Sequence, residues 1–321
     1  MKRKSNWRPL EFKDIKTSSL RKRKSKVEAN RFASPLRPGS PFKGFLHSLP
    51  QILAAGDFKE VVSHIVESVR GDKMVLLGMG AHPIKVGVSP IIIDLLKRGI
   101  IRGVAMNGAG IVHDVEIALA GRTSEEVEEG LGSGLFGVTN ETAEFINGAL
   151  KDGHKEGWGF GEAIGKALQK EEGLPYRDMS ICAAASQLGV PLTVHVAIGT
   201  DVVHIHPSTD GSIIGELTYR DFRLFAALVA SLEGGIYINM GSAVIMPEVF
   251  LKALSAARNL GYRLEDFVTL NMDFIQHYRP TQNVVRRPTA KGGKGFALTG
   301  HHEIMFPLLA AAVIEGLEDT A

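Results

Sequence analysis

The architecture of this chain is set by residues 73–114, which read KMVLLGMGAHPIKVGVSPIIIDLLKRGIIRGVAMNGAGIVHD. Two short apolar segments, 73–77 and 101–106, have the composition of buried strands, and each is followed by a glycine-rich turn. A helical pattern follows each turn, first over residues 90–98 and then after the NGAG motif at 107–110. This order of strand, turn and helix is typical of right-handed βαβ units. The segment therefore predicts a parallel sheet covered by helices.

The same alternation continues through the rest of the chain. Further strands are predicted, with helices between them, at residues 191–196, 235–239 and 267–272. A polar stretch at 276–303 is predicted to be a functional loop, because structureless loops of that length are uncommon in compact domains. A last helix is predicted near the end of the chain. Residues 45–321 are therefore expected to form one α/β domain, a Rossmann-like three-layer fold with a mainly parallel sheet.

Residues 1–44 differ from the remainder in charge. They hold 14 Lys and Arg against 3 Asp and Glu, whereas the remainder holds 23 against 32. We predict a flexible basic arm that docks on the acidic surface of its own or a neighbouring subunit. Nucleic acid is a less favoured partner, because the arm has little aromatic interleaving. No apolar run is long enough for a membrane span, and the single cysteine, Cys182, cannot form an internal disulfide. These features predict a cytoplasmic protein.

Glycines and small polar residues gather where the predicted strands end. The turns are Gly78–His82, Asn107–Gly110, Gly199–Asp201, Gly241–Ser242 and Asn271–Asp273. Ligands of open parallel sheets bind outside the carboxyl ends of the strands, where helix N-termini favour phosphate. The G-x-G-x-x-G spacing is absent after the first strand. The turns therefore predict a nucleotide site that lacks this motif.

Two pairs of histidines are candidates for proton transfer. His204 and His206 are separated by one residue, which would place both imidazoles on one face of an extended segment. His301 and His302 are adjacent. Because imidazole titrates near neutral pH, one of these residues is expected to be a general acid or base. Such histidines can also bind zinc, but the pattern is not specific, and no metal is predicted.

The glycine-rich segment AKGGKG carries two lysines, Lys291 and Lys294. A desolvated lysine can lose its proton and form an imine with a carbonyl compound. The flanking glycines would leave the amine accessible. The residues themselves do not decide between the two lysines, and a solvated surface loop is the alternative.

These motifs resemble those of the deoxyhypusine synthase family over residues 74–314. VSPIIIDLLKRGIIRGVAMNGAGIVHDVEIAL (88–119) is similar to the family's segment with a T-A-G-G turn, and GGIYINMGSAV (234–244) to its glycine-rich strand end. RRPTAKGGKG (286–295) lies where the family has its imine-forming lysine. The resemblance implies Lys294 or Lys291 as catalytic residue with His301 and His302. It also implies an NAD site formed by Gly80, His82, Asn107, Gly108, Ala109, Gly110, Asp114, Asp201, Gly241, Ser242 and Asn271.

The resemblance implies an NAD-dependent transferase that works as a homotetramer. The family oxidises spermidine and carries the resulting imine on a lysine before passing it to an acceptor. The acidic residues that hold the polyamine are absent here, and the corresponding stretch is basic. We therefore expect a small amine or an amino acid as substrate in place of spermidine, in aminoalkyl transfer or oxidative amine chemistry.

Two alternatives stay open at this point. The first is an NAD enzyme similar to ornithine cyclodeaminase, which oxidises an amine transiently. The second is a nucleotide-binding module without catalytic activity, whose basic arm binds a polyanion. The titratable residues near the predicted strand ends favour an enzyme over the second alternative.

Overall fold

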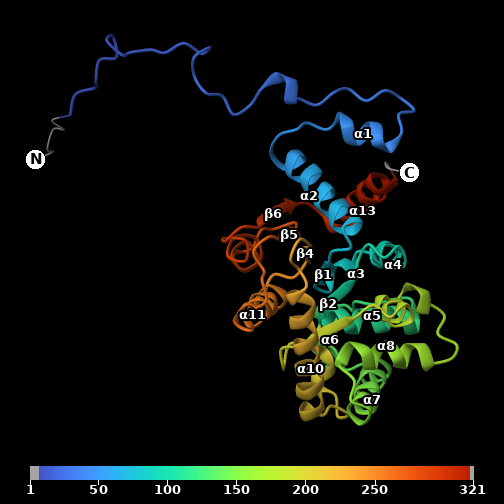
Figure 1. The fold of residues 1–321 in the computed structure, drawn as a ribbon. Coiled ribbons are helices and arrows are strands. Elements are labelled where there is room, and N and C mark those ends of the chain that lie inside the picture. Colours follow the sequence, from blue (N-terminus) through green and yellow to red (C-terminus); the bar gives the residue numbers. More distant parts are fainter. Residues whose placement is uncertain (1–6, 319–321) are drawn as a thin grey trace, which may run out of the picture.

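The computed structural model describes residues 7–318 and consists of a helix-covered sheet preceded by an extended arm (Figure 1). The strands are β1 (Val75–Met79), β2 (Gly103–Asn107), β3 (Leu192–His195), β4 (Ile236–Met240), β5 (Val268–Asp273) and β6 (Lys294–Thr299). The α-helices are α1 (Phe42–Ser48), α2 (Leu53–Arg70), α3 (His82–Lys85), α4 (Ser89–Lys97), α5 (Gly108–Ala120), α6 (Val127–Ser133), α7 (Asn140–Glu156), α8 (Phe160–Lys170), α9 (Ile181–Leu188), α10 (Gly211–Ala230), α11 (Ile245–Asn259), α12 (Tyr278–Pro280) and α13 (His302–Glu318). Three 3₁₀-helices and one π-helix complete the fold, namely η1 (Ala29–Arg31), η2 (Arg177–Met179), η3 (Val202–Ile205) and the π-helix η4 (Thr281–Arg286).

All six strands form one parallel sheet in the order β3-β2-β1-β4-β5-β6. The chain builds outward from β1 to β3, crosses back, and then builds outward in the other direction from β4 to β6. The order of the strands therefore reverses between β1 and β4. In open α/β sheets this reversal creates a crevice at the carboxyl edge. The predicted Rossmann-like α/β fold with a parallel sheet is confirmed.

The two faces of the sheet are covered by different helices, because successive strand residues point to opposite sides. In β1, Val75, Leu77 and Met79 pack in one apolar cluster with residues of α2, α4, α5, α9 and α13. Leu76 of the same strand packs in a second cluster with α11 and the end of α10. The core thus has three layers, with the central strands β1 and β4 buried along their whole length.

The predicted strands are present within two residues of their expected bounds, but the loop predicted at 276–303 is wrong. This stretch contains α12, the π-helix η4 and the edge strand β6. β6 begins with a lysine and a glycine, and only alternate residues near its end are buried. An edge strand with one solvent-exposed face has only a weak pattern of apolar residues, which explains why β6 was not predicted.

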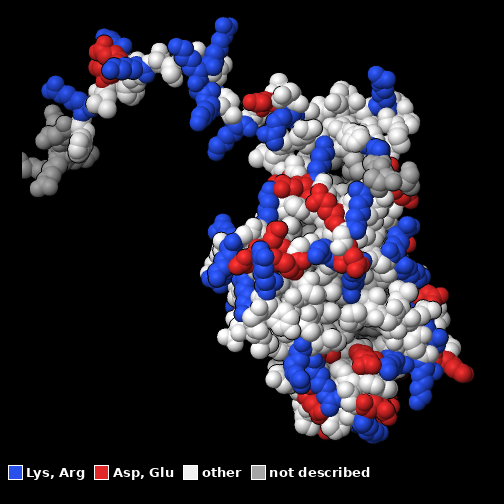
Figure 2. Space-filling model, viewed as in Figure 1, with Lys and Arg blue, Asp and Glu red and all other residues white. Residues whose placement is uncertain are grey.

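The basic arm extends from the body up to η1 (Figure 1). The contact with the body begins at the end of η1, where the Arg31 carbonyl accepts the Gln51 N–H and Ser34 donates its N–H to the Ser48 carbonyl, both at 2.9 Å. Lys and Arg side chains line it along its length (Figure 2). The flexibility of the arm and its docking partner stay predictions. Among residues 7–318 no helix combines the length and the apolar character that crossing a bilayer requires.

The buried hydroxyl of Tyr237 in β4 provides a test of the packing between the central strands. The ring stacks on Phe250 at 3.9 Å between centroids, and within the described residues the hydroxyl has no hydrogen-bond partner. A Cβ atom on Gly78 would collide with this hydroxyl. We expect Tyr237→Phe to leave the stability unchanged or to raise it by about 1 kcal/mol, because an unpaired buried hydroxyl is removed. Urea denaturation measures the difference, and a loss of more than about 1 kcal/mol would reveal a bridging partner.

Candidate functional site

Two glycines meet where the strand order reverses. Gly80 follows β1 and donates its N–H to the Met240 carbonyl at 3.0 Å, and Gly241 follows β4 and donates to the Met272 carbonyl at 3.2 Å. A Cβ atom on Gly80 would overlap the Gly241 carbonyl oxygen and lie 3.0 Å from its carbonyl carbon. Gly241 itself has a φ of +64°, which favours glycine. The two turns can approach this closely only because neither residue has a side chain.

Four rings gather on the β4–β6 side of these glycines. His82 of α3 lies 5.3 Å from His302 and 5.6 Å from Phe274, measured between ring centroids. Phe274 in turn stacks on His301 at 6.0 Å with an interplanar angle of 7°. Phe274 and His301 are exposed, whereas His302 is fully buried. The sequence-predicted residues His82, Gly241, His301 and His302 are thus brought together, and Phe274 was missed.

The ring of His302 is oriented by the backbone. Its Nε2 lies 3.1 Å from the Met272 carbonyl oxygen, so Nε2 donates a proton there. Nδ1 is therefore an acceptor in the neutral ring, and it has no hydrogen-bond partner within the described residues. Burial, and next the nearby His302 ring, lower the pKa of His82. The neutral form of the His82 imidazole is accordingly favoured beside the glycine turns.

Asp201 and the start of α5 form the β2–β3 side of the edge. Asn107 accepts the Gly110 N–H at 3.0 Å and caps α5, and Ala109 donates its N–H to the Asp201 carboxylate. A Cβ atom on Gly108 would collide with the same carboxylate. Oδ2 of Asp201 is buried without a hydrogen-bond partner within the described residues, and burial raises the pKa of this carboxyl. The predicted residues Asn107, Gly108, Ala109, Gly110 and Asp201 therefore do form one cluster.

His204 completes the turn that carries Asp201. Its Nδ1 accepts the N–H of Asp201 at 3.3 Å and that of Gly199 at 3.2 Å, so the proton of the neutral ring is on Nε2. Nε2 lies 3.8 Å from Oδ2 of Asp201. His206 is buried separately, with its Nδ1 2.8 Å from Ser208. Because residues 202–205 form a 3₁₀-helix, the expected extended segment with both imidazoles on one face is wrong.

Ser242 and Asn271 stabilise the turns from inside. Asn239 donates to the Asn271 side-chain oxygen at 2.7 Å and to the Ser242 carbonyl at 3.0 Å, and Asn271 donates to Gln276 at 2.7 Å. The Ser242 hydroxyl accepts the Met246 N–H at the start of α11. Asn271 is fully buried, so its side chain braces β5 against β4 and is not free to contact a cofactor. Asn239 and Gln276 were missed, because nothing in their sequence spacing reveals this network.

Asp114 is a correction to the predicted cofactor site. Its carboxylate is fully buried and accepts the Ser180 hydroxyl at 2.5 Å and the N–H groups of Ile181 and Cys182 at 2.7 and 3.0 Å. It therefore caps the start of α9 from α5, with both oxygens engaged. Burial raises the pKa of Asp114, although these hydrogen bonds act to lower it. Asp114, which follows the turn at residues 107–110, therefore has a structural role, because its side chain points into the helix layer.

The two lysines are a second correction. Lys294 is the first residue of β6 and Lys291 precedes it, whereas His301 and His302 follow the end of that strand. The lysines thus lie at the amino edge of the sheet, opposite the glycine turns. Lys294 Nζ forms an ion pair with Glu60 of α2 and lies 4.9 Å from the Phe296 ring centroid. Within one copy of the chain, neither lysine can be the imine-forming residue of the carboxyl edge.

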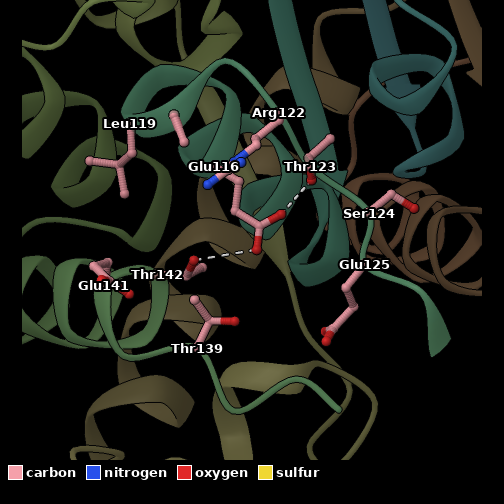
Figure 3. Close-up of a pocket in the computed structure, with 10 residues that line it drawn as sticks. Glu116, Leu119, Arg122, Thr123, Ser124, Glu125, Thr139, Glu141 and Thr142 are labelled. Atoms are coloured by element: carbon pink, nitrogen blue, oxygen red, sulfur yellow. Dashed lines mark hydrogen bonds between the residues drawn. The ribbon is translucent and has the colours of Figure 1, made fainter. Parts of the chain in front are cut away.

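A hollow that the sequence did not reveal lies beside α5. It has a volume of about 580 Å³ and is formed by α5, the start of α7 and the segment between them (Figure 3). A smaller hollow of about 140 Å³ continues toward the sheet edge and is lined by Ala109, His113 and Asp201 among others. Glu116, Ser124 and Glu125 line both. Within the described part of the chain no three His, Cys, Asp or Glu side chains are grouped closely enough to hold a metal ion.

The strand order and the crowded carboxyl edge define a Rossmann-like α/β chain. No family model matches the sequence, and no curated protein matches it. Solved structures do match. A provisionally assigned deoxyhypusine synthase from Entamoeba histolytica has a TM-score of 0.51 and 11% identity, covering 88% of this chain and 96% of that one. The resemblance to deoxyhypusine synthases is thereby confirmed at the level of the fold.

Two further structures belong to larger enzymes. ArgZ, an arginine dihydrolase from the ornithine–ammonia cycle in cyanobacteria, has a TM-score of 0.51 and 12% identity and covers 82% of this chain. AgrE, in its ternary complex with ornithine and NAD⁺, has a TM-score of 0.50, 14% identity and the same coverage. The present chain spans 32% and 33% of their lengths, which is about a third. At these identities the likeness concerns the fold alone.

Proposed function

We propose that this chain is an NAD-dependent enzyme that oxidises a small amine at the carboxyl edge of its sheet. One observation carries the proposal. The backbones of Gly80 and Gly241 approach each other closely at the strand reversal, between an aromatic cluster and the start of α5. Dinucleotides bind across such a reversal in sheets with this strand order. The fold it shares with AgrE, whose structure holds NAD⁺ and ornithine, supports both the cofactor and an amine or amino-acid substrate.

The phosphates would lie at the amino end of α13. This helix begins at His302, directly beside Gly241, and its first N–H groups have no partners within the helix. The amino end of α5 is less suitable, because Asn107 and the carboxylate of Asp201 already accept its N–H groups. A helix N-terminus favours a diphosphate through its free N–H groups and its dipole.

The exposed pair Phe274 and His301 would hold one base of the dinucleotide, and the hollow beside Asp201 would receive the other end. Neighbouring strands lie about 4.8 Å apart, so the edge from β5 to β2 measures roughly 14 Å. A dinucleotide laid along it would contact both the aromatic cluster and the α5 cluster. The nicotinamide end belongs at the hollow, because that is where titratable side chains gather.

Phe274→Ala tests the nucleotide site. Phe274 is 44% exposed, so its loss leaves the core intact. We expect the affinity for NAD⁺ to fall about three- to tenfold, as ring stacking is worth about 0.5–1.5 kcal/mol. Isothermal titration with NAD⁺, NADP⁺ and ADP-ribose measures the change.

Tyr262→Ala is the matched control, because Tyr262 is an exposed aromatic residue that precedes β5 at the opposite edge. Equal affinities of the two variants, or no dinucleotide binding by the wild type, would contradict the proposal. Native mass spectrometry of the purified protein reports a bound nucleotide and the number of subunits together. A panel of amines and amino acids, followed by the absorbance of reduced nicotinamide, then tests the reaction.

A further inference from the structure

Three side chains beside the hollow form a continuous hydrogen-bonded chain. Nδ1 of His113 lies 2.5 Å from the Thr123 hydroxyl, which in turn donates to Oε2 of Glu116. Thr142 of α7 donates to the other carboxylate oxygen, Oε1, at 3.3 Å. Figure 3 shows Glu116 between Thr123 and Thr142, with a dashed line to each. The residues come from α5, the segment after it and α7, so the fold assembles the chain.

The direction of these hydrogen bonds determines the tautomer of His113. The Thr123 hydroxyl has one proton, and it is donated to Glu116. The hydroxyl can therefore only accept from His113, so that Nδ1 carries the imidazole proton. Nε2 is left as an acceptor, and it forms no hydrogen bond within the described residues. A base whose other nitrogen is held by a partner with a carboxylate behind it is the arrangement of general-base histidines.

The carboxylate at the end of the chain is ionised. Burial acts to raise the pKa of Glu116, but the nearby His113 imidazole and the hydrogen bonds from Thr123 and Thr142 outweigh it, so that the pKa is lowered. The side chains of His113 and Glu116 are only 16% and 22% exposed. The negative charge of Glu116 is thus partly shielded from water at the end of the chain that begins at His113.

The hollows place this base where a substrate could reach it. His113 lines the smaller hollow together with Asp201, whose buried Oδ2 has no hydrogen-bond partner within the described residues. The larger hollow adjoins it across Glu116 and Ser124 and has space for the remainder of a small molecule. Three carboxylates line the larger hollow against one cation, so the lining is net acidic; they are Glu116, Glu125 and Glu141, and the cation is Arg122.

We propose that the hollow beside α5 is the substrate site and that His113 is the proton acceptor of the reaction, with Thr123 and Glu116 as its positioning residues. This inference rests on the proposed function. Nε2 of His113 takes a proton from the ammonium form of the substrate, which leaves the neutral amine. A hydride then passes from the adjacent carbon to the nicotinamide of NAD⁺. The products are an iminium ion, NADH and a protonated His113, so charge and electrons balance.

The alternative is a structural clamp that only holds the segment after α5 against the helix. His113→Asn distinguishes the two. The side-chain amide of asparagine can take the place of Nδ1 and still donate to Thr123, but it offers no base. We expect NAD⁺ affinity in isothermal titration and the melting temperature to stay near those of the wild type. The rate of nicotinamide reduction with an amine substrate should fall at least about 100-fold.

Glu116→Gln supplies a readout that does not depend on turnover. Nitrogen NMR of the full-length protein without ligand reports which ring nitrogen of His113 carries the proton. We expect Nδ1 to carry it in the wild type. The variant should lose this preference, because the glutamine amide can donate to Thr123 and free the Thr123 hydroxyl to donate to Nδ1. Asp152→Asn, which changes an exposed carboxylate of α7 that pairs with Lys155, is the control and should leave the tautomer unchanged.

The outcomes separate the two proposals. If the wild type binds no dinucleotide or oxidises no amine, the proposed function fails and this inference fails with it. If the wild type turns over and His113→Asn is equally fast, only the inference is overturned. An unchanged His113 tautomer in Glu116→Gln would likewise refute the positioning role.

Discussion

Replacing Asp221 with alanine is expected to lower the free energy of unfolding by roughly 3–5 kcal/mol, because several buried donors would lose their acceptor. Asp221 of α10 accepts the N–H groups of Gly161 at 2.9 Å and Val194 at 2.7 Å, and Phe160 donates to it as well. The carboxylate thus ties β3 to the first turn of α8 from a third element. A Cβ atom on Gly159 would collide with it. Urea denaturation followed by circular dichroism measures the loss.

Asp221→Asn is the matched variant and adds a pH test. Burial, opposed by the N–H donors, raises the pKa of Asp221 to about 7 from an ordinary value of 3.8. Between these values the folded state retains a proton that the unfolded state has released. The stability from this group is therefore complete below about pH 4 and is lost as the pH rises through 7. The wild type should lose stability relative to Asp221→Asn between about pH 4 and pH 7. A constant difference over this range would contradict the raised pKa.

The second large effect is expected for Gly80→Ala. The new Cβ would overlap the Gly241 carbonyl, and neither turn can move freely, because both follow fully buried central strands. Overpacking of this kind costs about 3 kcal/mol or more when backbone has to shift. Since a Cβ atom on Gly241 would lie only 3.0 Å from the His302 ring, a shift of this turn should displace the aromatic cluster as well. We expect NAD⁺ affinity to fall more than about tenfold, which isothermal titration measures.

Gly215→Ala is the control for this variant. Gly215 lies in α10, and a Cβ atom there would meet nothing within 4 Å. This substitution should be neutral or stabilising by up to about 1 kcal/mol, because alanine favours the helix. If both alanine variants behaved alike, the close approach of the two turns would not be important.

The fold could be predicted from the sequence because its signals are local. Short apolar strands, glycine turns and amphipathic helices alternate, and each is recognisable within a dozen residues. β6 could not be recognised, because an exposed edge strand that begins with Lys294 and Gly295 has little apolar pattern. Because β6 was not predicted, the lysines were also placed at the wrong edge of the sheet. Without the strand, Lys294 and His301 read as parts of one loop, whereas β6 separates them to opposite edges of the sheet.

The candidate site was predictable where it depends on strand ends and not where it depends on side-chain direction. Gly80, Gly241 and His302 follow from the rule that turns of parallel strands share an edge. Asp114 follows the same turn as Gly110, but its side chain points to the start of α9. The chain from His113 through Thr123 to Glu116 depends on how the segment after α5 folds back over that helix, which no spacing in the sequence reveals.

The contact between Gly80 and Gly241 also joins the two halves of the molecule. β1 to β3 form one half and β4 to β6 the other, and the pairing of β1 with β4 is the only strand pairing across the seam within the described residues. A ligand bound along the carboxyl edge would contact both halves at once. Since any ligand that binds the native state stabilises it by mass action, the bound ligand would oppose separation of the two halves. Cofactor binding and the cooperative stability of the two halves would then be thermodynamically linked.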